Sequence, residues 1–131
     1  MWPFGRRRRR GVGQRGETLA RRFLRRRGLK ILAANYRCGA GEIDLIALDR
    51  GTRRETGAET LVFVEVKTRR QDRYVAPAAA VDAAKQRRIR RAAEHYLARH
   101  EASDLAVRFD VVSIVLPDGE PPRIDHLPDA F

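Results

Sequence analysis

The chain has 131 residues, of which 43% are apolar and 34% charged, and its 28 Lys and Arg against 17 Asp and Glu give a formal net charge of +11. At this length we expect one domain with a buried core. No apolar run is long enough to cross a bilayer. The single cysteine, Cys38, excludes an intrachain disulfide framework and a multi-cysteine zinc site. We therefore expect a cytoplasmic protein with no membrane partner.

The positive charge is concentrated at one end of the chain. Residues 1–30 contain twelve basic residues and one acid, Glu17, whereas the rest is balanced. We expect residues 1–13, which surround Arg6–Arg10 with Pro and Gly, to be a flexible Arg-rich leader, either a solubilising tail or a binding patch. Such an end favours polyanions, because each neutralised phosphate releases counterions. Residues 14–131 are expected to form the single folded domain.

The first half of the domain predicts a helix followed by three strands. From Gln14, apolar residues at helical spacing run to Gly28, which is typical of a helix end. Strands are expected over residues 29–36, 42–49 and 61–67, separated by a glycine turn and a polar connection over 50–59. The third strand, LVFVEVK, is apolar on both sides, which indicates a central position covered on both faces.

The second half predicts a long helix over 78–100 and strands over 107–116 and 124–127. The buried face of the helix is expected to comprise Val81, Ala84, Ile89, Ala92, Ala93, Tyr96 and Leu97. Consecutive strands pair antiparallel, and a helix between strands serves as a crossover. The order α-β-β-β-α-β-β therefore predicts an α/β fold with a mixed four- to five-stranded sheet flanked by helices.

Two charged residues interrupt the strongest strand. Glu65 and Lys67 share one face of it, and burying either charge alone is expensive. Asp44 lies on the preceding strand between apolar neighbours, so strand pairing would bring it to Glu65. Two carboxylates held close together repel each other unless a cation lies between them. Mg²⁺ is such a cation, and it binds one or two carboxylates together with several waters. A metal beside a lysine is suited to phosphodiester hydrolysis.

Each of these residues also has a structural interpretation. Glu65 and Lys67 make an exposed ion pair if the strand lies at the surface, and Asp44 then belongs to a polar outer face. Glu17, in the predicted first helical turn, either favours the helix dipole or reaches the same metal as a third acid. The three histidines, His95, His100 and His126, are interpreted as surface or packing residues.

Several strings together resemble the YraN-like bacterial family from about Arg15 to Phe131. They are Gly16-Glu17, Gly41-Glu42-Ile43-Asp44-Leu45-Ile46, Phe63-Val64-Glu65-Val66-Lys67 with Arg69, Lys85, Arg108-Phe109-Asp110-Val111-Val112 and Ala130-Phe131. That family is similar to the restriction-endonuclease-like PD-(D/E)xK superfamily and to archaeal Holliday junction resolvases. The resemblance implies Glu17, Asp44 and Glu65 as metal acids, the Val66 carbonyl as a further ligand and Lys67 as the catalytic lysine. Ile43 stands where the pattern name has a proline.

The basic clusters fit such a site as phosphate contacts. The residues expected to bind nucleic acid are Arg21, Arg25, Arg69, Arg70, Arg73, Lys85 and Arg88. The sequence thus predicts a Mg²⁺- or Mn²⁺-dependent endonuclease acting on DNA, selective for branched structure rather than base sequence. The alternative is a nucleic-acid-binding protein of the same fold without catalysis. Cutting two opposed strands of a junction favours a homodimer.

Overall fold

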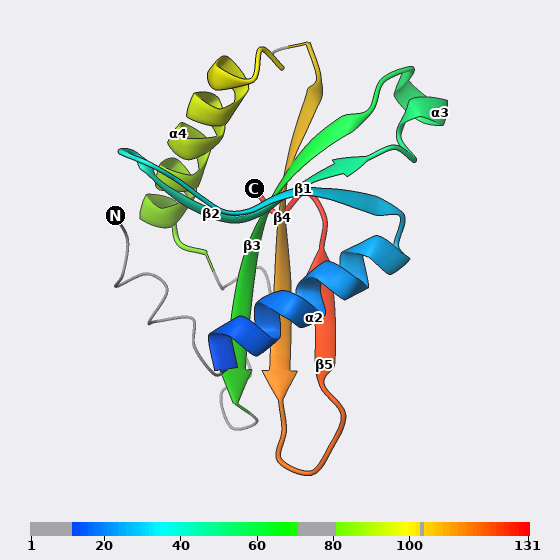
Figure 1. Cartoon of the computed structure of the whole chain (residues 1–131), viewed down its shortest axis with the longest axis vertical. Helices are drawn as coiled ribbons and strands as arrows, with labels where there is room; N and C mark the ends of the chain where they lie inside the picture. The colour runs from blue at the N-terminus through cyan, green and yellow to red at the C-terminus, as the bar shows by residue number, and fades with distance from the viewer. Residues whose placement is uncertain (1–11, 71–80, 103) are drawn as a thin grey trace.

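The computed structural model describes residues 12–70, 81–102 and 104–131, which fold into a five-stranded sheet with helices on both faces. The elements are α2 (Val12–Arg26), β1 (Leu29–Cys38), β2 (Gly41–Asp49), α3 (Arg53–Thr56), β3 (Thr60–Arg70), α4 (Ala83–Arg99), β4 (Ala106–Leu116) and β5 (Arg123–Leu127). Figure 1 shows β3 and β4 side by side through the middle. This confirms the α/β fold with a mixed sheet, an arrangement consistent with a restriction-endonuclease-like fold.

The strands lie in the sheet in their order along the chain. β1, β2 and β3 pair antiparallel, β3 and β4 pair parallel over their whole length, and β5 returns antiparallel to β4. The parallel pair requires a crossover, and α4 lies within that connection. The predicted topology is confirmed, and β3 is the central strand.

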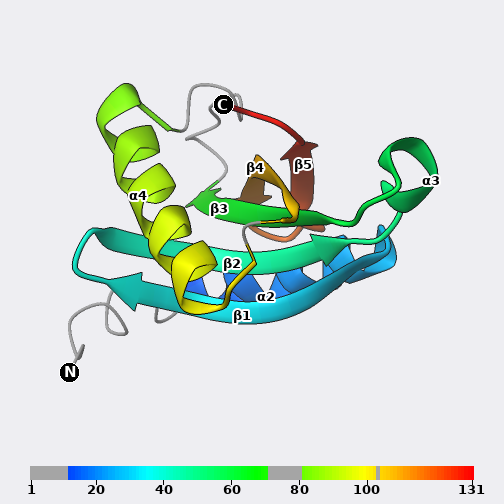
Figure 2. The same cartoon turned by 90° about the horizontal axis from the view of Figure 1, so that it is seen from above.

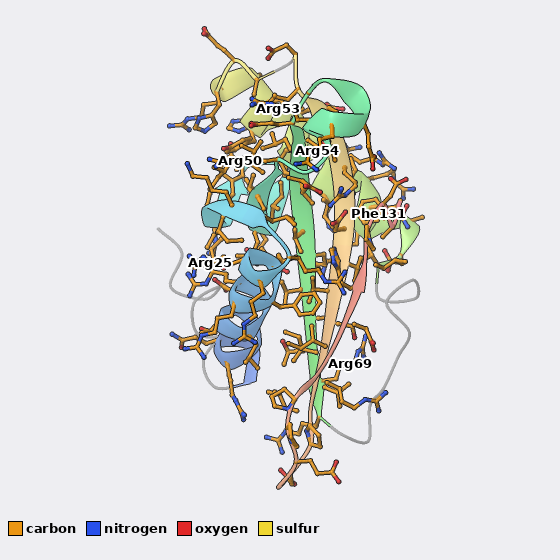
Figure 3. The ribbon with its side chains drawn as sticks, turned by 90° about the vertical axis from the view of Figure 1, so that its right-hand side faces the viewer. Arg25, Arg50, Arg53, Arg54, Arg69 and Phe131 are labelled. Atoms are coloured by element: carbon orange, nitrogen blue, oxygen red, sulfur yellow. The ribbon has the colours of Figure 1, made fainter. Side chains whose placement is uncertain are left out.

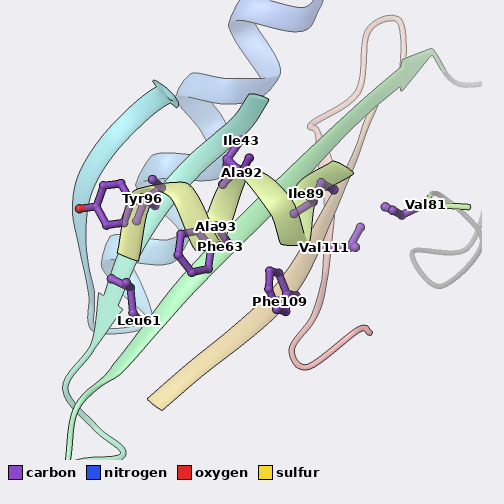
Figure 4. Close-up of a cluster of buried hydrophobic side chains, with 11 residues drawn as sticks. Ile43, Leu61, Phe63, Val81, Ile89, Ala92, Ala93, Tyr96, Phe109 and Val111 are labelled. Atoms are coloured by element: carbon purple, nitrogen blue, oxygen red, sulfur yellow. The ribbon is translucent and has the colours of Figure 1, made fainter. Parts of the chain in front are cut away.

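The two long helices, α2 and α4, cover opposite faces of the sheet (Figure 2). Alternate residues of β3 divide between them: Val62 and Val64 pack with Leu24 of α2, whereas Leu61 and Phe63 pack on the α4 side. Figure 4 shows the latter cluster, in which Phe63 lies near Tyr96 and Ala93 of α4. Period-two alternation in a strand buried on both faces explains its continuous apolar sequence.

The boundaries of the elements differ from the predictions in instructive ways. Helix α4 begins after Asp82, whose side chain accepts a hydrogen bond from the Lys85 amide at 2.8 Å and caps the helix. Ala84, predicted to be buried, is exposed, because it lies five residues before Ile89 and therefore well round the helix from the buried stripe. The polar connection after β2 contains the short helix α3, which was not predicted.

Some predictions fall outside the described residues. Residues 1–11 of the predicted Arg-rich leader are outside the described residues. Residues 78–80, at the start of the predicted long helix, are outside them as well. Helix α2 begins at Val12, two residues before the predicted start. Among the described helices, none combines the length and apolar character needed to cross a membrane.

Candidate active site on β2 and β3

Two of the predicted acids meet where β2 and β3 run side by side. The last paired residues of β2 and β3 at this end are Leu45 and Val64, so Asp44 and Glu65 follow them on adjacent strands. The Val66 amide donates a hydrogen bond of 2.8 Å to Asp44 Oδ2. Asp44 and Glu65 are only 3% and 5% exposed. The structure therefore contradicts the interpretation that these residues lie on a solvated face.

Glu65 is neutralised by a lysine from the crossover helix. Lys85 Nζ forms an ion pair with Glu65 Oε2, and the carboxylate is buried while the lysine is about one-third exposed. Lys67, two residues along β3, lies close to both. Burial, and then the positive charge of Lys85, lowers the pKa of the Lys67 ammonium below its ordinary value, against the opposing effect of Glu65. The site therefore combines two buried carboxylates with two neighbouring amines.

Glu17 approaches from the opposite helix. It is buried, and its Oε1 accepts a hydrogen bond of 3.1 Å from Asn35 Nδ2. Asn35 lies between the residues of β1 that pair with Leu45 and Ile43, and hence opposite Asp44. Because α2 starts at Val12, Glu17 is in the second helical turn, and the predicted first-turn dipole role is wrong.

The donors at this site suit a hard divalent cation in part. Asp44 and Glu65 offer carboxylate oxygens on neighbouring strands, and Mg²⁺ commonly uses one or two carboxylates with water completing its shell. Within the described ranges, however, no three His, Cys, Asp or Glu side chains gather closely enough to hold a metal together. The structure thus brings Asp44 and Glu65 together with Lys67, but not Glu17 with them into a three-acid cluster.

Glycine at position 16 sets how closely α2 approaches the sheet. A Cβ there would lie 2.8 Å from Thr68 Cβ and closer still to its hydroxyl, so only glycine lets the helix cross β3 at this point. This close crossing also holds the neighbouring Glu17 over the sheet. Packing therefore explains the glycine of the Gly16-Glu17 pair, and the candidate site chemistry concerns the glutamate.

We expect Gly16→Ala to destabilise the protein by about 1–3 kcal/mol, the usual effect of overpacking, although alanine favours a helix by roughly 1 kcal/mol. Urea unfolding measures this change. Adding Thr68→Ala to Gly16→Ala should recover part of the loss. Gly39→Ala is the matched control, because a Cβ at Gly39 meets nothing within 4 Å. Equal effects at Gly16 and Gly39 would contradict the packing argument.

The predicted nucleic-acid-binding residues do not form one surface. Arg21 and Arg25 lie on α2, across the sheet from the Glu65 carboxylate, whereas Arg88 is exposed on α4. The third strand was predicted to end at residue 67, but β3 continues through Arg69 and Arg70, because they pair with Val115 and Leu116 of β4. Arg73 lies outside the described residues.

The arginines of the described residues are spread along the length of the molecule. Figure 3 shows Arg25 on α2, Arg69 near the end of β3 and Arg50, Arg53 and Arg54 around α3. The α3 arginines were not among the predicted contacts. Arg69 is near enough to Lys67 for its charge to add to the lowering of that pKa. Positive charge therefore reaches the candidate site from β3 itself.

Asp110 on β4 is a fourth buried carboxylate among the described residues, and no structural role was predicted for it from the sequence. Arg108 binds it with two hydrogen bonds of 2.8 and 3.0 Å, the Asp129 amide donates at 3.0 Å, and His126 Nε2 lies 2.8 Å away. Arg108 also reaches Asp49 at 3.0 Å. The sequence signal was the same as for Glu65: an acid within an apolar strand.

This network joins several elements on the α2 side of the sheet. His126 of β5 packs edge-on against Phe23 of α2, with ring centroids 5.9 Å apart. Because an ionised carboxylate only accepts hydrogen bonds, His126 Nε2 carries the proton shared with Asp110. Burial would raise the pKa of Asp110, but the hydrogen bonds from His126, Arg108 and Asp129 outweigh it and lower that pKa. His126 was expected to be an ordinary surface or packing residue, and its hydrogen bond to Asp110 was not anticipated.

The class of protein follows from these features: a small α/β protein of restriction-endonuclease-like architecture, whose central strands bury two acids beside a lysine. The chain belongs to the Uncharacterised protein family UPF0102, whose sequence pattern matches residues 16–114. The YraN-like resemblance is thereby confirmed.

The relatives of this family cover nearly all of the chain. It is 48% identical over 120 residues to a UPF0102 protein of Nocardia farcinica, covering 92% of this chain and 88% of the relative. It is 45% identical over 122 residues to one of Pelobacter propionicus, with 93% and 83% covered, and 45% identical over 120 residues to one of Geobacter metallireducens, with 92% and 91% covered.

Proposed function

We propose that this protein is a Mg²⁺- or Mn²⁺-dependent endonuclease that hydrolyses DNA phosphodiester bonds and prefers branched DNA. The observation that carries the proposal is the burial of Asp44 and Glu65 on adjacent strands, beside Lys67 and joined by the hydrogen bond from the Val66 amide to Asp44. Buried charges that break the apolar rule of a central strand are characteristic of functional sites.

Each residue then has a defined task. Asp44 and Glu65 would hold the divalent ion, with the Val66 carbonyl as a further donor and Glu17 acting from the α2 side through water. When bound, the ion lowers the pKa of a coordinated water and neutralises charge on the phosphate. The amide of Val66 fixes the orientation of the Asp44 carboxylate. Lys67, whose neighbour Lys85 already pairs with Glu65, is left to hydrogen-bond the attacking water or a phosphate oxygen.

Recognition of DNA by its backbone rather than by its base sequence is supported by the arginines of three elements. Arg25 of α2, Arg69 of β3 and Arg88 of α4 suit contacts to the phosphate backbone, which position DNA without reading bases. Symmetrical cleavage of a junction requires two active sites, so a homodimer belongs to this proposal.

The test is cleavage of junction, flap and linear duplex DNA with Mg²⁺, Mn²⁺ or EDTA. We expect divalent-ion-dependent cleavage that is faster on junction and flap than on linear duplex. Equal rates on all three substrates would contradict the structural selectivity. Absence of cleavage on every substrate, by protein that binds DNA and is folded, would contradict the nuclease function.

The second candidate is a nucleic-acid-binding protein without catalysis. The specific observation in its favour is that Glu65 is already neutralised by Lys85, while the described residues gather no three-ligand metal group. Binding of this kind would be carried by the basic surface alone. Stable complexes formed equally well with Mg²⁺ and with EDTA, with no product, would favour it.

Both candidates predict DNA binding that weakens steeply with salt. Replacing an arginine that contacts one phosphate should reduce the slope of log K against log salt by about 0.9. We expect this reduction for Arg25→Gln and for Arg88→Gln, measured by fluorescence anisotropy at several salt concentrations. Arg50→Gln, an exposed arginine outside the predicted set, is the control and should leave the slope unchanged. Unaltered slopes in Arg25→Gln and Arg88→Gln would remove α2 and α4 from the DNA-binding surface.

A further inference from the structure

Lys85 is placed at the candidate site by the start of helix α4. The Asp82 side chain caps the helix by accepting the Lys85 amide, and this fixes the backbone of the first turn. From there the Lys85 side chain reaches down to Glu65 Oε2. Lys85 thus comes from a different element than the other site residues, which lie on the sheet or on α2.

Glu65 is one negative charge with two lysine side chains close to it. A carboxylate that is 5% exposed is costly without a cation, and Lys85 supplies one. Lys67 lies beside Lys85 on the same face, so two ammonium groups share one carboxylate. A divalent ion on Glu65 would bring two further positive charges to the carboxylate group that Lys85 contacts. Lys85 and the ion therefore compete for Glu65.

The exposure of the two partners indicates which one moves. Glu65 is fixed within the central strand and almost fully buried, whereas the Lys85 side chain is 32% exposed at the end of a helix. Its long flexible stem can carry the ammonium group out to solvent while the methylene groups stay packed.

We infer that Lys85 is a resident counter-cation of Glu65, which a divalent ion displaces on binding and which is then free to contact the DNA phosphate. The inference rests on the proposed function, since it concerns the same site. It makes Lys85 a positioning residue with two alternative partners, Glu65 without the ion and phosphate with it. Metal binding and DNA binding are then coupled through one side chain.

The experiment measures Mn²⁺ affinity by electron paramagnetic resonance, in the absence of DNA, for the full chain and its variants. Removing the competing charge in Lys85→Met should tighten Mn²⁺ binding about tenfold, the equilibrium equivalent of one pKa unit of charge interaction. Lys85→Arg keeps the charge and should stay near the unsubstituted protein. Arg87→Met removes an exposed charge from the same helix and should also leave Mn²⁺ affinity unchanged.

A second measurement separates competition from misfolding. Thermal unfolding without metal should show Lys85→Met less stable, because Glu65 loses its partner, and saturating Mn²⁺ should raise its midpoint by more than that of the unsubstituted protein. Equal or weaker Mn²⁺ binding by a folded Lys85→Met protein would overturn the inference, while DNA cleavage by the unsubstituted protein would still stand. Failure of every variant to bind Mn²⁺ would overturn both this inference and the metal-dependent nuclease.

Discussion

Under the proposed nuclease function, replacing Glu65 with Gln is expected to abolish metal-dependent DNA cleavage while leaving the fold intact. Glutamine has nearly the shape of glutamate but no negative charge, so a divalent ion loses one of its two buried carboxylates. Removing one group that stabilises transition-state charge typically lowers kcat by roughly 10²–10³-fold. We expect a loss of at least this size in single-turnover cleavage of junction DNA with saturating Mn²⁺.

The control for this experiment is an acid outside the site. Glu120→Gln removes one exposed negative charge and should cleave like the unsubstituted protein. DNA binding by Glu65→Gln, measured without metal, should be equal or slightly tighter, because the substitution raises the net positive charge of the protein by one. Asp44→Asn and Lys67→Met should give losses comparable with that of Glu65→Gln. Full activity in all three variants would rule out this site on β2 and β3 as the catalytic centre.

Asp110→Ala is expected to destabilise the protein by about 3–5 kcal/mol, the range found when one partner of a buried charged pair is removed. Asp110 is fully buried and accepts hydrogen bonds from Arg108, His126 and the Asp129 amide. Its loss leaves those donors facing a cavity. Chemical denaturation at neutral pH measures the change in the free energy of unfolding.

The pH dependence provides an independent check of this network. The pKa of Asp110 is lowered in the folded state, so the stability it contributes is present above the unfolded-state value of about 3.9. That contribution is lost as the pH falls through the lower folded-state pKa. The difference in stability between the unsubstituted protein and Asp110→Asn should therefore be largest near neutral pH and should shrink in acid.

An exposed ion pair serves as the comparison for Asp110. Arg53 and Glu59 lie 3.1 Å apart, but the arginine side chain is 70% exposed. Arg53→Ala should change the free energy of unfolding by less than about 1 kcal/mol. A loss at Asp110 no larger than that at Arg53 would show that the network contributes little to stability.

The sequence predicted the sheet well because its signals are local. LVFVEVK is apolar on both sides, and the structure places it as β3, in the middle of the sheet and covered on both faces. The acids also followed from a local rule, since a charge within an apolar strand is expensive unless it has a partner. Asp44 and Glu65 obeyed it, and so did Asp110, for which the sequence analysis gave no role.

Other features depend on contacts between distant segments and left no local signal. The spacing of Lys85 from Glu65 does not reveal that α4 starts above β3. Asn35 takes a left-handed conformation, with φ of 54°, and its side-chain amide donates a hydrogen bond to Glu17, although Glu17 lies 18 residues away along the chain. The helix α2 starts at Val12, two residues before the predicted start, and this places Glu17 in the second helical turn instead of the first.

The irregular backbone of β1 also bears on how copies of the protein meet. β1 is an edge strand, with a register shift between Ile31 and Ala33 and the left-handed residue Asn35 within it. Such breaks spoil the straight row of amide and carbonyl groups that another chain would need to extend the sheet. On this side the molecule is protected against open-ended extension of its sheet, so the homodimer that belongs to the proposed function would use a surface other than the β1 edge.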